Sequence, residues 1–127
     1  MDWIATTIDA FGQSIGIEGL SLDDGGLLAM EAEDGAELAF QDLRAMGAPE
    51  LLVVVSKAVL GNREGALRTA LRLADFRASG PWAVQAGLDD DELTVAVRMP
   101  IGAVMLSSLE EAVDLALSVH REAEHGT

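Results

Sequence analysis

Residues 51–60, LLVVVSKAVL, are the most continuously apolar stretch of the chain. Val53, Val54 and Val55 are β-branched, and such side chains fit a pleated strand better than a helix. A strand that is apolar on both faces does not suit the rim of a sheet. We therefore expect residues 51–60 to form the central strand, with cover on both of its faces.

The composition predicts one acidic, soluble domain. Its 127 residues are 50% hydrophobic, enough to bury a core. Eight basic and 22 acidic residues give a net charge of −14, which opposes binding to nucleic acid or anionic membranes. Cysteine is absent, so disulfides and thiolate metal sites are excluded. The start lacks the basic flank of a signal peptide, and no apolar run approaches the roughly 20 residues of a membrane span, so we expect a cytoplasmic protein.

Four apolar residues near the N-terminus predict an amphipathic helix. They recur at helical spacing and are Ile4, Ile8, Phe11 and Ile15. Gly16 suits the left-handed position just past the helix end. The stripe either packs into the core, or part of it meets a partner.

A hairpin is expected between this helix and the central strand. Its strands are predicted over residues 27–32 and 36–41, and Glu33-Asp34-Gly35 joins them. An Asp-Gly step favours a tight turn because both positions tolerate positive φ. A short extended segment over residues 20–22 is expected to precede the hairpin.

After the central strand, the sequence predicts a helix and a second hairpin. Asn62 is a candidate N-cap for a helix over residues 63–78, which Gly80-Pro81 would end. Apolar residues alternate with others over 82–86 and 93–99, as expected of half-buried strands.

The last element is predicted to be a helix that begins at a capping box. Ser107 and Glu110 have the required spacing, and residues 123–127 are expected to be a flexible tail after a single domain over residues 1–122. The resulting order is α-β-β-β-α-β-β-α. It predicts a two-layer α+β fold, an antiparallel sheet with helices packed against it.

No stretch carries a catalytic or ligand motif. Residues 89–92, DDDE, lack the internal glycine and the late glutamate of a calcium loop, so they predict a solvated hairpin turn. His120 and His125 are expected on the surface, where neither has a fixed partner for general-base chemistry. Nucleophile elbows and nucleotide-binding glycine loops are not found. We therefore expect a non-enzymatic protein that uses no metal and no cofactor.

Binding through a surface is the remaining kind of function. Methionine either fills the core or provides an adaptable binding surface. Four methionines besides Met1 are numerous for a chain with three Phe and no Tyr: Met30, Met46, Met99 and Met105. Half of the basic residues fall in one segment and predict a solvated helix face: Arg63, Arg68, Arg72 and Arg77.

The size, acidity and order of elements together resemble the class I type III secretion chaperones, the Tir-chaperone-like family of small acidic cytoplasmic proteins. The resemblance covers about residues 3–122. It rests on a short first helix ending near Ile15-Gly16, on the middle helix, and on three segments: Leu20-x-Leu22-Asp23-Asp24, Gly80-Pro81-Trp82 and Val95-x-Val97-x-Met99-Pro100.

The resemblance implies bacterial cytoplasmic localisation and two protein partners besides the export apparatus of the secretion system. The first is a second copy of the chain, bound through the middle helix and the following strand at Leu67, Leu71, Ala74, Trp82 and Val84. The second is the N-proximal segment of a secreted effector, held in extended form and export-competent. Its side chains would enter apolar grooves at residues also compatible with a core: Phe11, Ile15, Leu28, Met30, Leu38 and Phe40. A regulatory interaction domain of the same fold, with no secretion role, is the alternative.

Overall fold

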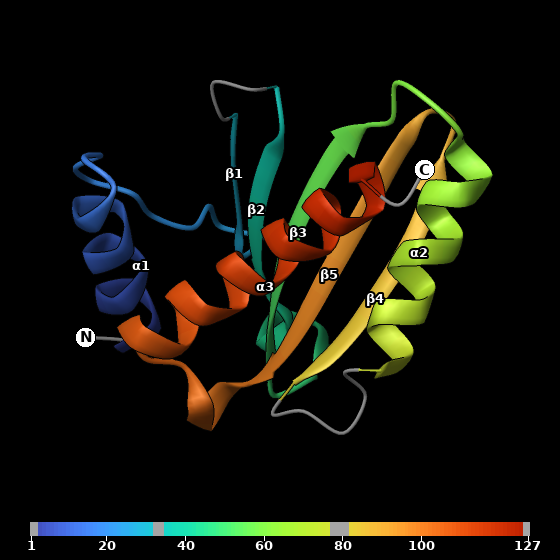
Figure 1. Ribbon diagram of the computed structural model, residues 1–127. Helices are drawn as coiled ribbons and strands as arrows, with labels where there is room; N and C mark the ends of the chain where they lie inside the picture. The colour runs from blue at the N-terminus through green and yellow to red at the C-terminus, as the bar shows by residue number, and fades with distance from the viewer. Residues whose placement is uncertain (1–2, 32–34, 77–81, 126–127) are drawn as a thin grey trace.

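The strand that the sequence predicts to be central, over residues 51–60, is the middle strand of a five-stranded antiparallel sheet (Figure 1). The computed structural model describes residues 3–31, 35–76 and 82–125, and in it β3 spans Glu50–Ala58. The strands run in the order β1-β2-β3-β5-β4 across the sheet. The other four are β1 (Leu27–Glu31), β2 (Glu37–Asp42), β4 (Ala83–Asp89) and β5 (Glu92–Pro100).

Within the described ranges, three helices lie on one side of this sheet (Figure 1). They are α1 (Trp3–Ser14), α2 (Arg63–Phe76) and α3 (Leu106–His125). Helix α3 crosses β3 and β5, α2 packs along β4, and α1 packs against α3. Short 3-10 turns, η1 (Leu43–Met46) and η2 (Ile101–Ala103), follow β2 and β5. The predicted order α-β-β-β-α-β-β-α and the α+β class are confirmed.

The strand register divides the sheet residues between two unlike faces. On the inner face, which the helices cover, Leu51, Val53 and Val55 of β3 are buried. On the outer face, Leu52 and Val54 of the same strand are only half-buried. The expectation of cover on both faces of the central strand is therefore wrong, because all three helices pack on the inner side.

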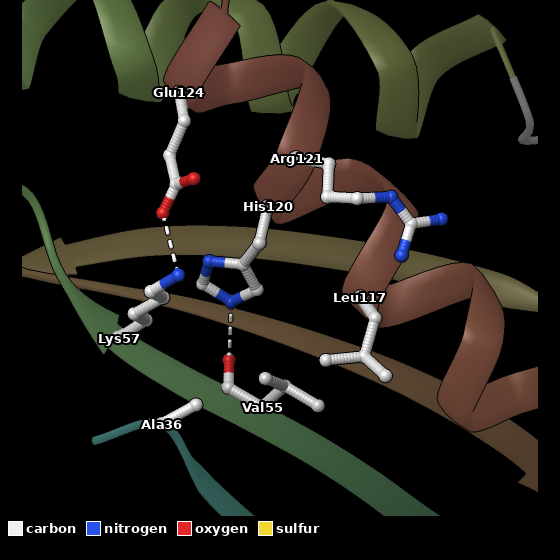
Figure 2. Close-up of a pocket in the computed structure, with 7 residues that line it drawn as sticks. All are labelled: Ala36, Val55, Lys57, Leu117, His120, Arg121 and Glu124. Atoms are coloured by element: carbon white, nitrogen blue, oxygen red, sulfur yellow. Dashed lines mark hydrogen bonds and ion pairs between the residues drawn. The ribbon is translucent and has the colours of Figure 1, made fainter. Parts of the chain in front are cut away.

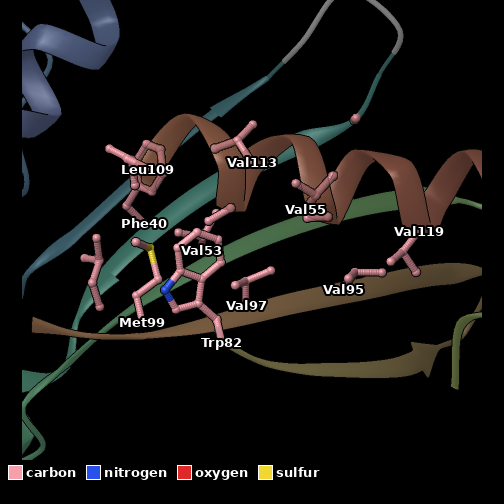
Figure 3. Close-up of a cluster of buried hydrophobic side chains, with 14 of the residues drawn as sticks. Phe40, Val53, Val55, Trp82, Val95, Val97, Met99, Leu109, Val113 and Val119 are labelled. Atoms are coloured by element: carbon pink, nitrogen blue, oxygen red, sulfur yellow. The ribbon is translucent and has the colours of Figure 1, made fainter. Parts of the chain in front are cut away.

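The core lies between the inner face and the helices. Figure 3 shows Val113 and Val119 of α3 above the valines of β3 and β5. At the other side of the core, the rings of Phe11 and Phe40 meet edge to face with their centroids 5.3 Å apart, a geometry that contributes about 0.5–1.5 kcal/mol beyond the buried area. No helix in the described part of the chain is long and apolar enough to span a membrane.

Helix α1 ends where its glycine signal predicts. The helix ends at Ser14, and Gly16 follows in the left-handed region with φ +85°. The N–H of Ile17 donates to the carbonyl oxygen of Gly12 over 2.8 Å, so the chain folds back on the helix. Only glycine permits this approach at residue 12, because a Cβ there would lie 2.7 Å from the carbonyl oxygen of Ile17. Three residues of the predicted stripe are buried, whereas Ile15 is 49% exposed: Ile4, Ile8 and Phe11. The extended piece expected over residues 20–22 does not pair as a strand.

The start of helix α2 agrees with the prediction. The backbone N–H of Gly65 donates to Oδ1 of Asn62 over 3.1 Å, which makes Asn62 the N-cap. The described part of α2 ends at Phe76. The rest of the predicted helix, to residue 78, and the Gly80-Pro81 step predicted to end it lie outside the described residues. Three alanines of α2 face the core: Ala66, Ala70 and Ala74.

Both ends of α3 differ from the prediction. The helix begins at Leu106, and its first backbone bond runs from the N–H of Leu109 to the carbonyl of Met105 over 2.9 Å. Ser107 is therefore inside the first turn and the capping-box prediction is wrong. At the other end the helix continues through Ala123, which is 1% exposed. The tail predicted from residue 123 is helical there because this alanine packs into the core.

Candidate functional site

Strands β1 and β2 extend past α3 (Figure 1), and the inner-face residues at their ends are only half-buried. Cross-strand pairing places Met30 opposite Leu38, and Leu38 opposite Val55. Residues directly opposite each other in an antiparallel pair project from the same face. We call Met30, Leu38 and Val55 the apolar row. It runs from half-buried side chains at the edge of the sheet to a buried one beneath α3.

A cavity of about 240 Å³ lies at the inner end of this row. Figure 2 shows its floor on β2 and β3, with α3 above it. The side chains that line it are mixed in chemistry: Ala36, Val55, Lys57, Leu117, His120, Arg121 and Glu124. An apolar row that leads into a cavity with a few polar groups has the general character of a binding site.

His120 is buried beside this cavity, not exposed as predicted. Its side chain is 5% exposed, and Nε2 lies 2.8 Å from the carbonyl oxygen of Val55. A carbonyl oxygen only accepts, so Nε2 carries the proton and donates it. The spacing of His120 from Val113 and Ala116 continues the apolar stripe of α3, and this signal could have located it.

An ion pair closes the cavity on its polar side. Nζ of Lys57 lies 2.7 Å from a carboxylate oxygen of Glu124 (Figure 2). Lys57 reaches α3 because it follows Val55 by two residues and so projects from the inner face. The pair is partly exposed, so its effect on stability is small, but it links β3 to the last turns of α3.

The residues expected to contact an effector separate into two groups. Leu28, Met30 and Leu38 lie together, half-buried, on the inner face of β1 and β2, and Ile15 is exposed just after α1. Phe11 and Phe40 are 4% and 0% exposed and pack against each other. These two rings belong to the core and have no surface for a partner. We therefore remove them from the residues expected to contact an effector.

The sheet has two edge strands that could pair with another chain. In the described residues, β1 pairs only with β2, and β4 pairs only with β5. The outer edge of β1 lies next to the apolar row. Unpaired N–H and C=O groups on such an edge can accept an added strand.

The residues expected at a dimer contact also form two groups, one accessible at the surface and one buried within the monomer. Leu71 is 47% exposed, and Leu67 and Val84 are half-buried, on α2 and on edge strand β4. Ala74 and Trp82 are buried within the monomer, and Figure 3 shows the indole among the core side chains. These two residues stabilise the monomer and are not available for a contact between copies. The described arginines of α2 are exposed, as predicted: Arg63, Arg68 and Arg72.

A cluster at the other end of the sheet was not predicted from the sequence. The carboxylate of Asp42 accepts from Nε of Arg44 at 3.0 Å and from Nη2 at 2.6 Å, and the Arg44 guanidinium lies 5.6 Å from the ring centre of Trp3. The side-chain hydrogen bonds from Arg44 lower the pKa of Asp42, more than burial raises it. The cluster connects η1 to α1 and supports the fold.

Both alternatives for the methionines occur. Met99 is completely buried, Met30 is half-buried, and Met46 and Met105 are 65% and 57% exposed.

Within the described ranges, no three acidic or histidine side chains gather in a way that could hold a metal ion. Residues Asp90 and Asp91 form the β4–β5 turn, as predicted for the acidic run.

No family model matches this sequence, and no curated protein matches it significantly. Solved structures do match its fold. A chain in the crystal structure of the ExsC–ExsE complex aligns with a TM-score of 0.77 and 19% identity, over 98% of this chain and 96% of that one. The HopA1–SchA chaperone–effector complex gives a TM-score of 0.72 and 17% identity, over 98% of both chains.

Two further structures extend this likeness. The Yersinia pestis type III secretion chaperone SycH, in complex with a fragment of YscM2, aligns with a TM-score of 0.64 and 15% identity, over 97% of this chain and 98% of that one. YbjN of E. coli, proposed to be a transcription regulator, aligns with a TM-score of 0.55 and 15% identity, over 94% and 91%. The chain therefore has the fold of the type III secretion chaperones, as its sequence resemblance predicts.

Proposed function

We propose that this protein is a type III secretion chaperone, which binds the N-proximal segment of a secreted effector in extended form and keeps it soluble until the export apparatus receives it. The observation that carries the proposal is the half-buried apolar row beside the open edge of β1. The fold supports it, since the chain resembles structures of the HopA1–SchA chaperone–effector complex and of the type III secretion chaperone SycH. Such holding needs surface contacts and no catalysis, in agreement with the expectation that the chain is not an enzyme.

An extended segment would bind by two complementary contacts. Its backbone would pair with the free edge of β1, and every second side chain would fall on the inner face beside Leu28, Met30 and Leu38. Full burial of one such side chain contributes about 1.5–3 kcal/mol. Because all three are already half-buried, they together add roughly 2–4 kcal/mol before the cost of ordering the segment.

We also propose a homodimer through the outward side of α2 and the edge of β4. Leu71 is the most exposed apolar side chain of this surface, and Leu67 and Val84 accompany it. A two-fold contact requires a surface that complements itself, and two antiparallel copies of an edge strand can meet this requirement.

The second candidate function is a regulatory protein-interaction domain with no secretion role. The likeness to YbjN favours it, because that protein is proposed to be a transcription regulator. The net charge of −14 opposes direct contact with DNA, so a regulator of this kind would act by binding another protein.

The test is co-purification of the tagged chain from its own cell extract, with mass spectrometry and light scattering of the complex. The chaperone proposal expects two copies of the chain with a larger protein bound through its N-terminal region. A signalling protein in its place would support the regulatory domain.

A matched pair of methionine variants makes the test specific. Met30→Glu places a charge in the apolar row and should reduce effector capture at least about tenfold, since one buried anchor is lost and a charge is desolvated. Met46→Glu, on η1 and 65% exposed, should leave capture unchanged. Equal capture by both variants would refute the assignment of the apolar row.

A further inference from the structure

The outer face of the sheet carries apolar side chains that no described element covers. Across four strands, cross-strand pairing aligns Ala29 with Ala39, Ala39 with Val54, and Val54 with Ala96. Leu52 of β3 and Leu27 of β1, which is 42% exposed, lie in the next row of the same face. All the helices are on the other side of the sheet (Figure 1). The centre of this face is therefore apolar, consists of small side chains, and is not covered by the described helices.

Acidic side chains lie at one end of this apolar centre. Glu31 lies directly opposite Glu37 on β1 and β2, and both are exposed. Glu92 and Asp89, a facing pair on β5 and β4, lie at the same end of the sheet. Like charges that face each other across two strands destabilise the pairing. A cationic partner would relieve this repulsion at both pairs.

The opposite end of the outer face is nearly neutral. Nη1 of Arg98 donates to a carboxylate oxygen of Glu50 over 3.1 Å, and Nη2 lies 3.5 Å from the amide oxygen of Gln85. With the two acidic pairs, this face thus carries five carboxylates and one guanidinium. A second copy would bring one acidic face against another, and a phosphate surface would be repelled. These charges match only a basic occupant.

We propose that the outer face is a second docking surface, for a segment of another protein that carries apolar side chains flanked by lysine or arginine. The apolar part would cover Val54, Ala39 and Ala96, and the cationic part would lie over Glu31 and Glu37. The surface is on the opposite side of the sheet from the apolar row. It can therefore be occupied while the row holds another chain, and the two proposals can fail independently.

The experiment is methyl NMR of the full chain titrated with a short synthetic peptide of alternating leucine and lysine. Strand β3 contains its own internal control, because its successive residues project from opposite faces. The methyl resonances of Leu52, Val54 and Ala96 should shift, while those of Val53 and Val55 should not. A peptide of alternating leucine and glutamate should leave all of them in place.

Two charge reversals then test the electrostatic part. Glu37→Lys should weaken peptide binding at least about threefold at low salt. The introduced lysine would lie opposite Glu31, and such a pair of opposite charges should not harm the fold. Glu110→Lys changes an exposed acid on α3 and should alter the affinity less than about twofold.

Three results would overturn the proposal. They are shifts confined to inner-face residues such as Met30 and Leu38, no methyl shifts at all, and an equal loss of affinity in both charge reversals. Outer-face shifts on concentrating the protein without peptide would instead assign this face to a second copy.

Discussion

Two neighbouring valines of β3 should differ sharply in what they contribute to stability. Val53 is completely buried on the inner face and Val54 is half-buried on the outer face. Replacement by alanine removes two methyl-sized groups from either residue. At about 0.8 kcal/mol for each group, plus the cavity left in a closed core, Val53→Ala should cost about 2–3 kcal/mol. Val54→Ala loses about half of the transfer free energy and leaves no cavity, so it should cost about 0.5–1 kcal/mol.

The comparison isolates the position of the side chain, because both substitutions remove the same β-branched residue from the same strand and share the same loss of strand propensity. Urea unfolding followed by circular dichroism measures the two free energies, with equal m-values as the sign that both variants unfold from comparable states. Equal losses for Val53→Ala and Val54→Ala in the isolated chain would refute the one-sided packing from which both proposed surfaces are derived.

The remaining predictions concern acid stability and the contact between copies. The pKa of Asp42 is lowered in the folded protein, so its carboxylate stabilises the fold above its unfolded pKa and this contribution is lost as the pH falls through the folded value. Asp42→Asn should therefore lower the free energy of unfolding at neutral pH and flatten its decline below about pH 4, measured by urea unfolding across that range; an unchanged acid profile would contradict this. Trp82→Asp should abolish cooperative unfolding, because it places a charge in the core. Leu71→Asp should leave the fold intact and shift the protein toward monomer in sedimentation; a monomeric parent protein would contradict the proposed dimer.

Several local features were correctly predicted because they depend on residues close together in sequence. The alternation from Leu93 to Met99 predicted β5, and Asn62 was identified as the N-cap of α2. The order of elements followed from these signals. Gly16 was likewise identified as the residue just past the end of α1. The error at the end of α3 had a tertiary cause, because Ala123 is buried against the core.

The candidate sites were predicted less well than the fold. Phe11, Phe40 and Trp82 were assigned to binding surfaces, but each packs inside the monomer. His120 was assigned to the surface and is buried against β3. Hydrophobicity identifies residues that avoid water, and it does not distinguish those covered by their own chain from those that await a partner.

The sequence by itself determined the kind and order of the elements, the central place of residues 51–60 and the acidity that excludes nucleic acid. These properties follow from periodicity, turn residues and composition, which are local or additive. Only the tertiary structure decided which apolar faces are covered. All three described helices pack on one side of the sheet. The outer end of the apolar row, at Met30, and the outer face, at Val54, are therefore only half-buried. Burial depends on which distant segments meet, and no short stretch of sequence contains that information.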